Sequence, residues 1–478
     1  MGRFTKKQMP AWAKTGHAKP VTRRDFLAHG IIPFAASALV PSALGLLTTS
    51  VPSAMAAAVN CPASSGGMAS FITLNLAGGA SLSSNFLPRD IGGQMLASYG
   101  KLGGGTPANL TTVNEFGVDA FVTTSPLLAG LKSVATAPTL ANTAFIGVCV
   151  QSADDSSANK LDVSGMAFKA GALGSLLPNL GKSSTSTGIR QMASTVSPPP
   201  PLVVGTFTDL GNSIGYTAAL RTQLNQAQRV SLTKLVEGLS TSQARKLASI
   251  NSTAQVQTLV ECAGIKNNGL ISQGAAIVDP LANSADQGTA AAAVFGITAG
   301  TAANAQNRVF GSMVYNSLAG KAGTVSLEMG GYDYHNGTRT TGDNQDRNAG
   351  VVIGQILEAA RVMNKSVFVY VTSDGSVVSA DSATPGSVWN SDRGGAGSAL
   401  IFMYSPAGRP VTSGMQIGQY TAGQVADPAS IIGSSPEVAA QAVFANYLQF
   451  NKKLNLFSSI TNSSALQGAA LTGVVKVG

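Results

Sequence analysis

“TVSLEM” (residues 324–329) and “SVFVYVT” (366–372) flank “DNQDRNAGVVIGQILEAARVMN” (343–364). The two outer segments are short, apolar and rich in β-branched residues, which indicates strands buried on both faces. The middle segment predicts an amphipathic helix, because its apolar residues recur at helical spacing and form one stripe. That stripe consists of Ala349, Val352, Ile353, Ile356, Ala360 and Met363. A strand, a helix and a strand in succession predict a right-handed βαβ crossover in a mostly parallel sheet.

Four further segments share this apolar, β-branched character. They are “SFITLNL” (70–76), “AFIGVCV” (144–150), “PLVVGTF” (201–207) and “ALIFMYS” (399–405). Runs that are apolar on both faces require a sheet that helices cover on each side. The sequence therefore predicts an α/β fold with a mostly parallel sheet and helices on both faces.

Two other regions are predicted to be helical. One begins with “LRTQLNQAQRVSLTKLVEGL” (220–239) and continues after the cap-like Ser240, which predicts a helical insertion at about residues 211–265. The other is “SSPEVAAQAVFANYLQF” (434–450), with Ser435 as N-cap and Pro436 at the first helical position. No internal repeat or long linker divides the chain, so residues 59–478 are predicted to form a single domain.

The first 58 residues have the order of a signal peptide. A basic segment is followed by “TRRDFLA” (22–28), a mildly apolar run and the small-residue stretch “PSAMAAA” (52–58). The apolar run is interrupted by Pro33 and Pro41, so it is too weakly apolar for a stable membrane span, and an amphipathic anchor is the less favoured alternative. The pair Arg23-Arg24 before Phe26-Leu27 resembles the twin-arginine export signal. We expect a periplasmic or secreted protein that meets the twin-arginine machinery and signal peptidase.

This leader also accounts for most of the positive charge. The whole chain carries 31 Lys and Arg against 22 Asp and Glu, a net charge of +9. Removing residues 1–58 takes away seven basic residues and one acidic residue, which lowers the net charge to +3. The basic balance therefore gives no reason to expect a nucleic-acid partner.

The chain has three cysteines, Cys61, Cys149 and Cys262. Cys149 lies inside an apolar run, which predicts a buried thiol. An oxidising compartment allows one disulfide, with Cys61 and Cys262 as one choice of pair. No Cys/His spacing typical of zinc sites occurs.

Polar loops follow or precede the predicted strands, and four of them carry carboxylates. These are Asp154 and Asp155, Asp333, Asp374 and Asp381, and Asp392. In open α/β sheets ligands bind at the carboxyl ends of the strands. Oxygen ligands from several strand ends, joined by the imidazole of His335, could hold a divalent cation. Any one of these acids alone is better explained as a turn former or helix cap, so the hypothesis rests on the cluster.

The leader, “LNLAGGASLSSNFLP” (74–88), “GGYDYH” (330–335), “SDG” (373–375) and “SDRGGAGSAL” (391–400) together resemble a bacterial exported family catalogued as domain of unknown function 1501. That family is related to the alkaline phosphatase and sulfatase superfamily. The resemblance implies one alkaline-phosphatase-like α/β domain with a metal site at the carboxyl edge of its sheet. It implies Asp333, His335, Asp374 and Asp392 as metal ligands.

The departures from the family pattern reduce the implied site. Ser81 stands where the family has a ligand Asp, and Arg393 stands where it has a His. His17 and His29 belong to the leader, so His335 is the only histidine in residues 59–478. The superfamily's two-metal mechanism draws on several imidazoles. The sequence therefore allows one divalent ion (Ca²⁺, Mg²⁺ or Zn²⁺) or none.

Two functions follow from this reduced site. The favoured one is an exported binding or structural protein of the envelope or extracellular space, with a degenerate metal site. The alternative is a single-metal hydrolase of phosphate or sulfate esters, in which Arg393 binds the substrate anion. The candidate nucleophiles of this hydrolase are Ser81, Ser156 and Ser157, and the sequence does not choose among them.

Overall fold

A computed structural model describes residues 67–152, 160–182, 201–214, 223–251, 264, 271–335, 337–392, 394–433 and 435–478. Within these ranges the side chains are described except at 243–251 and 391–392. Outside them lie the predicted leader, Arg393, Ser156, Ser157, Asp154, Asp155, Cys61 and Cys262.

The central sheet has eight strands in the order β12-β4-β11-β8-β1-β7-β5-β6. All of them run in one direction except β11, which is antiparallel to both of its neighbours. Read from β6 to β12 and numbered along the chain within this sheet alone, the order is 4-3-5-1-6-7-2-8. The predicted α/β fold with a mostly parallel sheet is therefore confirmed. The strands are β1 (Ser70–Leu76), β4 (Thr143–Cys149), β5 (Leu180–Gly181), β6 (Leu202–Val203), β7 (Val325–Met329), β8 (Val367–Ser373), β11 (Ser398–Tyr404) and β12 (Gln416–Ile417).

Five of the six predicted strands lie within one residue of their expected bounds. The exception is the segment 201–207, where β6 covers only Leu202–Val203 and helix α8 (Phe207–Ser213) follows. The Asp209 carboxylate accepts a hydrogen bond of 2.7 Å from the Thr206 backbone N–H. This bond forms one half of a capping box, so the chain turns into a helix where the apolar run alone predicts more strand.

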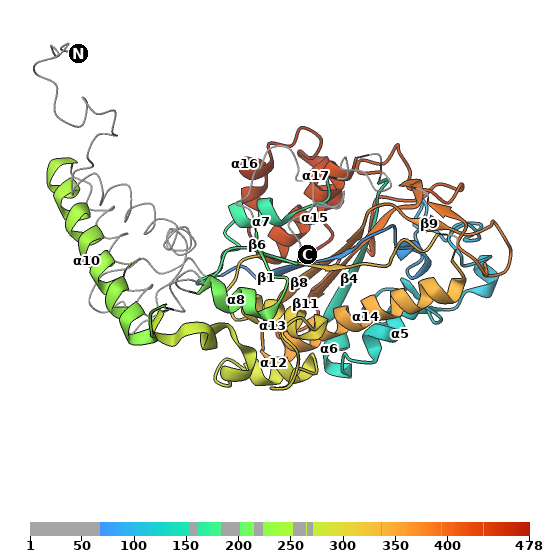
Figure 1. Ribbon diagram of the computed structural model, residues 1–478. Coiled ribbons are helices and arrows are strands. Elements are labelled where there is room, and N and C mark those ends of the chain that lie inside the picture. The colour runs from blue at the N-terminus through green and yellow to red at the C-terminus, as the bar shows by residue number, and fades with distance from the viewer. Residues whose placement is uncertain are drawn as a thin grey trace, which may run out of the picture.

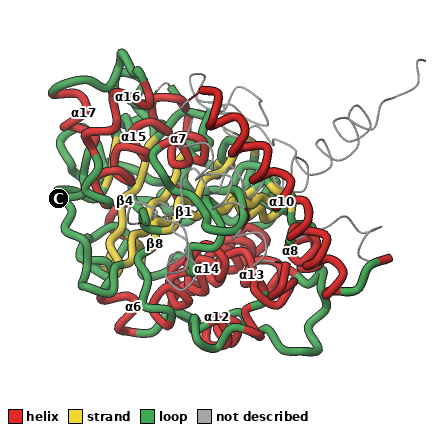
Figure 2. Tube along the Cα trace, turned by 90° about the vertical axis from the view of Figure 1, so that its left-hand side faces the viewer, coloured by secondary structure: helices red, strands yellow, loops and turns green. Residues whose placement is uncertain are grey.

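Helices cover both faces of the sheet (Figure 1). The sheet has one buried hydrophobic cluster on each face, and β8 contributes to both. Val367, Val369 and Val371 belong to one cluster, and Phe368 and Tyr370 belong to the other. This alternation is the two-residue period of a strand buried on both faces. The valine side is covered by α5 (Pro126–Lys132), α6 (Ala137–Ala141), α12 (Gly288–Val294), α13 (Gln306–Leu318) and α14 (Arg339–Val362). The aromatic side is covered by α7 (Ser164–Lys169), α15 (Pro436–Phe450), α16 (Phe457–Thr461) and α17 (Ala469–Val474) (Figure 2).

The predicted crossover helix is α14, and the predicted closing helix is α15. Helix α14 begins four residues earlier than expected, because the Thr338 side chain caps it by accepting from the Thr341 N–H. It packs closely on α5, where a Cβ built on Gly354 would lie 2.6 Å from the Leu131 carbonyl oxygen. At α15 the Ser435 side chain accepts from the Val438 N–H and Pro436 opens the helix, as predicted.

Small paired strands extend the fold beyond the sheet. Strands β2 (Thr112–Val113) and β3 (Phe121–Val122) pair with each other, as do β9 (Val377–Val378) and β10 (Ser391–Asp392). Helix α10 (Gln226–Asn251) lies in the predicted insertion and extends away from the sheet (Figure 1). No helix among the described residues combines the length and apolarity that a bilayer span requires.

Cys149 ends β4 and is fully buried with a free thiol, which confirms the prediction for this residue. Burial raises the pKa of the thiol far above its usual range.

Candidate functional site

The loop 330–335 leaves the carboxyl end of β7 and is held against the turn that follows β1. The Tyr332 N–H donates to the Ala77 carbonyl oxygen at 3.1 Å. The Gln345 side-chain amide on α14 donates to the Gly331 carbonyl oxygen at 2.9 Å. Gly331 has φ +89°, a conformation that favours glycine, so the second glycine of “GGYDYH” turns the chain out of the strand.

The two tyrosines of this loop point inward and the two predicted ligands point outward. Tyr332 and Tyr334 are buried, whereas the side chains of Asp333 and His335 are 54% and 32% exposed. This alternation follows from the two-residue period of an extended segment. It explains why an acid and a histidine two residues apart reach the same side.

Tyr334 anchors the loop through a buried polar network. Its hydroxyl accepts from the Ser81 N–H at 2.7 Å and donates to the Asp346 carboxylate at 3.1 Å. The other oxygen of Asp346 accepts from the Asn85 side-chain amide at 2.6 Å. Burial raises the pKa of Asp346 to about 7, although the hydrogen bonds from Asn85 and Tyr334 oppose this shift.

This network was not predicted from the sequence. Asp346 lies three residues before Ala349 and seven before Ile353, so it continues the apolar stripe of α14 by one turn. An acidic residue on the apolar stripe of a helix indicates a buried polar network, because a buried carboxyl group requires hydrogen-bond partners.

Asp374 lies directly after β8 and is almost completely buried. Its Oδ1 accepts from the Gly78 N–H at 2.8 Å. The neighbouring Ser373 hydroxyl accepts from the Ala80 N–H and donates to the Leu76 carbonyl oxygen, both at 2.7 Å. The carboxyl ends of β8 and β1 are thus tied together by side-chain to backbone hydrogen bonds.

Asp333 and Asp374 both meet the turn after β1. A Cβ built on Gly78 would lie 2.6 Å from the Cβ of Asp333, while the Gly78 N–H bonds to Asp374. The Asp333 Oδ1 in turn lies against the His335 Nδ1. The structure therefore brings Asp333 and Asp374 to one turn of the chain, with His335 beside Asp333.

Asp392 and Asp381, the remaining predicted carboxylates within the described ranges, have no described contact with the turn after β1. Asp392 pairs with Val377 through the β9–β10 ladder, and its side chain is not among those described. Asp381 forms a surface network in which its Oδ1 accepts from the Gln424 side chain at 3.1 Å, and Lys101 lies 4.0 Å away. Among the side chains that the structure describes, no three His, Cys, Asp or Glu groups form a cluster able to hold a metal ion.

Ser81 is the one candidate nucleophile within the described ranges. It is fully buried, and its hydroxyl has no hydrogen-bond partner among the described residues. Its backbone N–H is bonded to Tyr334, so the residue is fixed at the end of the Gly78 turn.

The antiparallel direction of β11 brings another predicted loop to this edge. Ser398 at the start of β11 pairs with Cys149 at the end of β4. The segment 394–397, directly before β11, therefore lies at the edge where the parallel strands end. The Ser152 hydroxyl accepts from the Gly375 N–H at 3.1 Å, and the Ser152 N–H donates to the Gly394 carbonyl oxygen at 3.0 Å, which links the ends of β4, β8 and the start of β11.

A scan against protein-family models matched no family, and searches of curated proteins and of solved structures also gave no match.

Proposed function

We propose that this chain is an exported protein of the bacterial periplasm or extracellular space that serves as a binding or structural protein and carries a degenerate metal site. The observation that supports this proposal most directly is the use of the Asp374 carboxylate. It is buried and accepts a hydrogen bond from the Gly78 N–H, so it performs a structural task that needs no ion.

The other two described candidates support the same proposal. Asp333 is paired with His335, and both side chains are partly exposed. An exposed carboxylate paired with an imidazole at the surface holds an ion weakly unless further ligands complete the shell. His335 is the only imidazole beyond the leader, so a second nitrogen ligand is not present in residues 59–478.

The alternative is a hydrolase of phosphate or sulfate esters that uses a single divalent ion. Asp333 and Asp374 contact the turn after β1, and His335 lies beside Asp333. The buried Ser81 hydroxyl in that turn has no hydrogen-bond partner among the described residues. In this alternative Asp333, His335 and Asp374 hold the ion, Asp392 assists, and Arg393 binds the anionic substrate. A bound ion would supply charge stabilisation and a more acidic nucleophile.

One experiment separates the two functions. The protein is purified with its metal content preserved, bound metals are measured by elemental mass spectrometry, and hydrolysis of aryl phosphates and aryl sulfates is assayed with Ca²⁺, Mg²⁺ or Zn²⁺. We expect less than one equivalent of metal and no turnover. Turnover that is lost in His335→Ala and kept in Asp381→Ala would overturn the proposal, because Asp381 is a similarly exposed carboxylate outside the Gly78 turn.

A further inference from the structure

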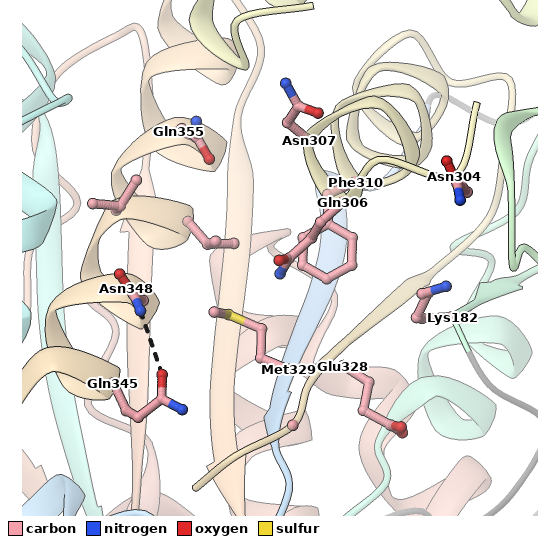
Figure 3. Close-up of a pocket in the computed structure, with 13 residues that line it drawn as sticks. Lys182, Asn304, Gln306, Asn307, Phe310, Glu328, Met329, Gln345, Asn348 and Gln355 are labelled. Atoms are coloured by element: carbon pink, nitrogen blue, oxygen red, sulfur yellow. Dashed lines mark hydrogen bonds between the residues drawn. The ribbon is translucent and has the colours of Figure 1, made fainter. Parts of the chain in front are cut away.

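A cleft of about 680 Å³ opens between α13, α14 and the carboxyl end of β7 (Figure 3). This volume is in the range of about 300–1,000 Å³ that is usual for small-molecule sites. Gly330 lines the cleft, and Gln345 both lines it and holds the Gly331 carbonyl oxygen. The cleft therefore adjoins the loop that carries Asp333 and His335.

Side-chain amides dominate the lining. They are Asn304, Gln306, Asn307, Gln345, Asn348 and Gln355 (Figure 3). An amide offers donors and an acceptor in one planar group. A hydroxyl group is also both donor and acceptor, so a wall of amides matches a ligand that carries many hydroxyl groups.

Some of these amides are hydrogen-bonded within the protein and others are available. Asn307 donates to the Phe295 carbonyl oxygen at 3.1 Å, and Asn348 donates to the Gln345 side-chain oxygen at 3.3 Å. Asn304 and Gln306 are exposed, and their side chains form no hydrogen bond with the described residues. Fixed amides reduce the entropy lost on binding, and the available ones supply new hydrogen bonds.

The charges of the cleft favour a neutral ligand. Lys182 and Glu328 are the two charged residues in the lining, and they have opposite sign. The Lys182 ammonium group already donates to the Gly205 carbonyl oxygen at 3.0 Å. The Glu328 carboxylate would repel a phosphate or sulfate, and the Lys182 ammonium group would repel a cation.

An extended peptide is the competing ligand, because peptides can add to a free strand edge. β7 is paired with β1 along Val325–Met329 but with β5 only at Val325 and Ser326, so a peptide probe is part of the test. Phe310, Met329 and Val352 line the cleft but are at most 9% exposed, so they offer little apolar surface to a peptide side chain.

We propose that this cleft binds a neutral carbohydrate. The inference deepens the proposed function and rests on it, since it supplies a ligand class for a binding protein. It uses a separate set of side chains from Asp333, His335 and Asp374.

The purified protein is titrated by isothermal calorimetry with maltotriose, cellotriose, xylotriose and chitotriose. Trigalacturonate, inorganic phosphate and trialanine are the competing probes. We expect binding of at least one neutral oligosaccharide. Gln306→Ala and Asn348→Ala should each weaken it about tenfold, the effect of one lost hydrogen bond in a binding site.

Gln94→Ala is the matched control, because it removes an exposed amide from a loop outside the cleft and should leave affinity unchanged. Circular dichroism confirms that each variant is folded. Failure of all four neutral sugars to bind, preference for phosphate or trialanine, or full affinity in both cleft variants would overturn the inference. The metal and hydrolysis assays test the proposed function independently, because they do not depend on the cleft amides.

Discussion

Asp374 and Gly78, which lie 296 positions apart in the chain, are joined by a hydrogen bond of 2.8 Å from the Gly78 N–H to the Asp374 carboxylate. The bond ties the end of β8 to the turn after β1, and these strands are neighbours in the sheet. A residue that the sequence presents as a metal ligand thus has a structural task. The distinction between these two roles can be measured.

Replacing Asp374 with Ala should lower the free energy of unfolding by about 1–3 kcal/mol, because a backbone N–H in a buried setting loses its acceptor. Asp374→Asn keeps an acceptor oxygen and should lose less. Urea denaturation of the metal-free protein measures both values. Equal stability of Asp374→Ala and the unchanged protein would show that the hydrogen bond contributes nothing.

Gly78→Ala should be more damaging than an ordinary substitution of a turn glycine. Gly78 has φ +117°, and a new Cβ would collide with the backbone of Asp333. Gly93→Ala is the control, since Gly93 has φ +73° with open space around it. We expect a loss of about 1–2 kcal/mol at Gly93 from backbone strain alone, and of about 3 kcal/mol or more at Gly78. Similar losses at both positions, measured by urea denaturation, would contradict the close contact with Asp333.

Asp346 should make stability depend on pH. Burial raises the pKa of its carboxyl group from 3.8 to about 7 in the folded chain. Between about pH 4 and 7 the folded chain therefore retains a proton that the unfolded chain has released, so the free energy of unfolding falls as pH rises. The slope from this group is roughly 1 kcal/mol per pH unit.

Urea denaturation at several pH values between 4.5 and 7 tests this dependence. Asp346→Asn should flatten the slope, whereas Asp381→Asn, at a more exposed carboxylate, should keep it. A slope that is the same in all three proteins would assign the pH dependence to other groups.

His335→Ala should change stability by less than about 1 kcal/mol. The ion pair of His335 with Asp333 is partly exposed, and exposed ion pairs contribute little. Thermal and urea denaturation of the variant provide the measurement. A loss as large as that of Asp374→Ala would mean that the outward side of the loop stabilises the fold, which the exposure of these side chains does not predict.

Cys149 should resist thiol reagents in the folded protein, because the thiolate is the reactive form and burial raises its pKa strongly. An aromatic disulfide reagent should therefore modify Cys149 only after urea is added. Under non-reducing denaturing conditions one reactive thiol is expected if Cys61 and Cys262 form a disulfide. Cys149→Ala should then show none, and rapid reaction of Cys149 in the folded protein would contradict its burial.

The strands and the crossover helix were predictable because their signals are local. The run at 70–76 has Ile72, Leu74 and Leu76 on one face, and the run at 366–372 alternates valines with Phe368 and Tyr370. The apolar stripe of α14 repeats every three to four residues. The short length of β6 was harder to predict from the sequence. The apolar run indicates a longer strand, but the capping interaction of Asp209 with Thr206 starts a helix within that run. The helix α13, with many small and polar residues in “QNRVFGSMVYNSL”, was not predicted, although most of its side chains are buried.

The candidate site was predictable in part. The alternation of “GGYDYH” places Asp333 and His335 on one side, and the structure has them paired. The buried position of Tyr334 depends on its hydrogen bonds with Ser81 and Asp346. Both residues lie in other segments of the chain, so the sequence of the loop alone does not predict them. The cleft was not predicted, because its lining comes from β7, α13, α14 and the segments beside them, and no single segment has an unusual composition.

The α/β class, the apolar strands and the amphipathic crossover helix can be predicted from the sequence, because they depend on the spacing of neighbouring residues. The antiparallel direction of β11, the hydrogen bond between Gly78 and Asp374 and the grouping of six amides at one cleft are visible only in the folded chain. Strand direction and side-chain partnership are set by which distant segments can pack together and satisfy each other's buried polar groups. That information is spread over the whole chain and is not contained in any one segment.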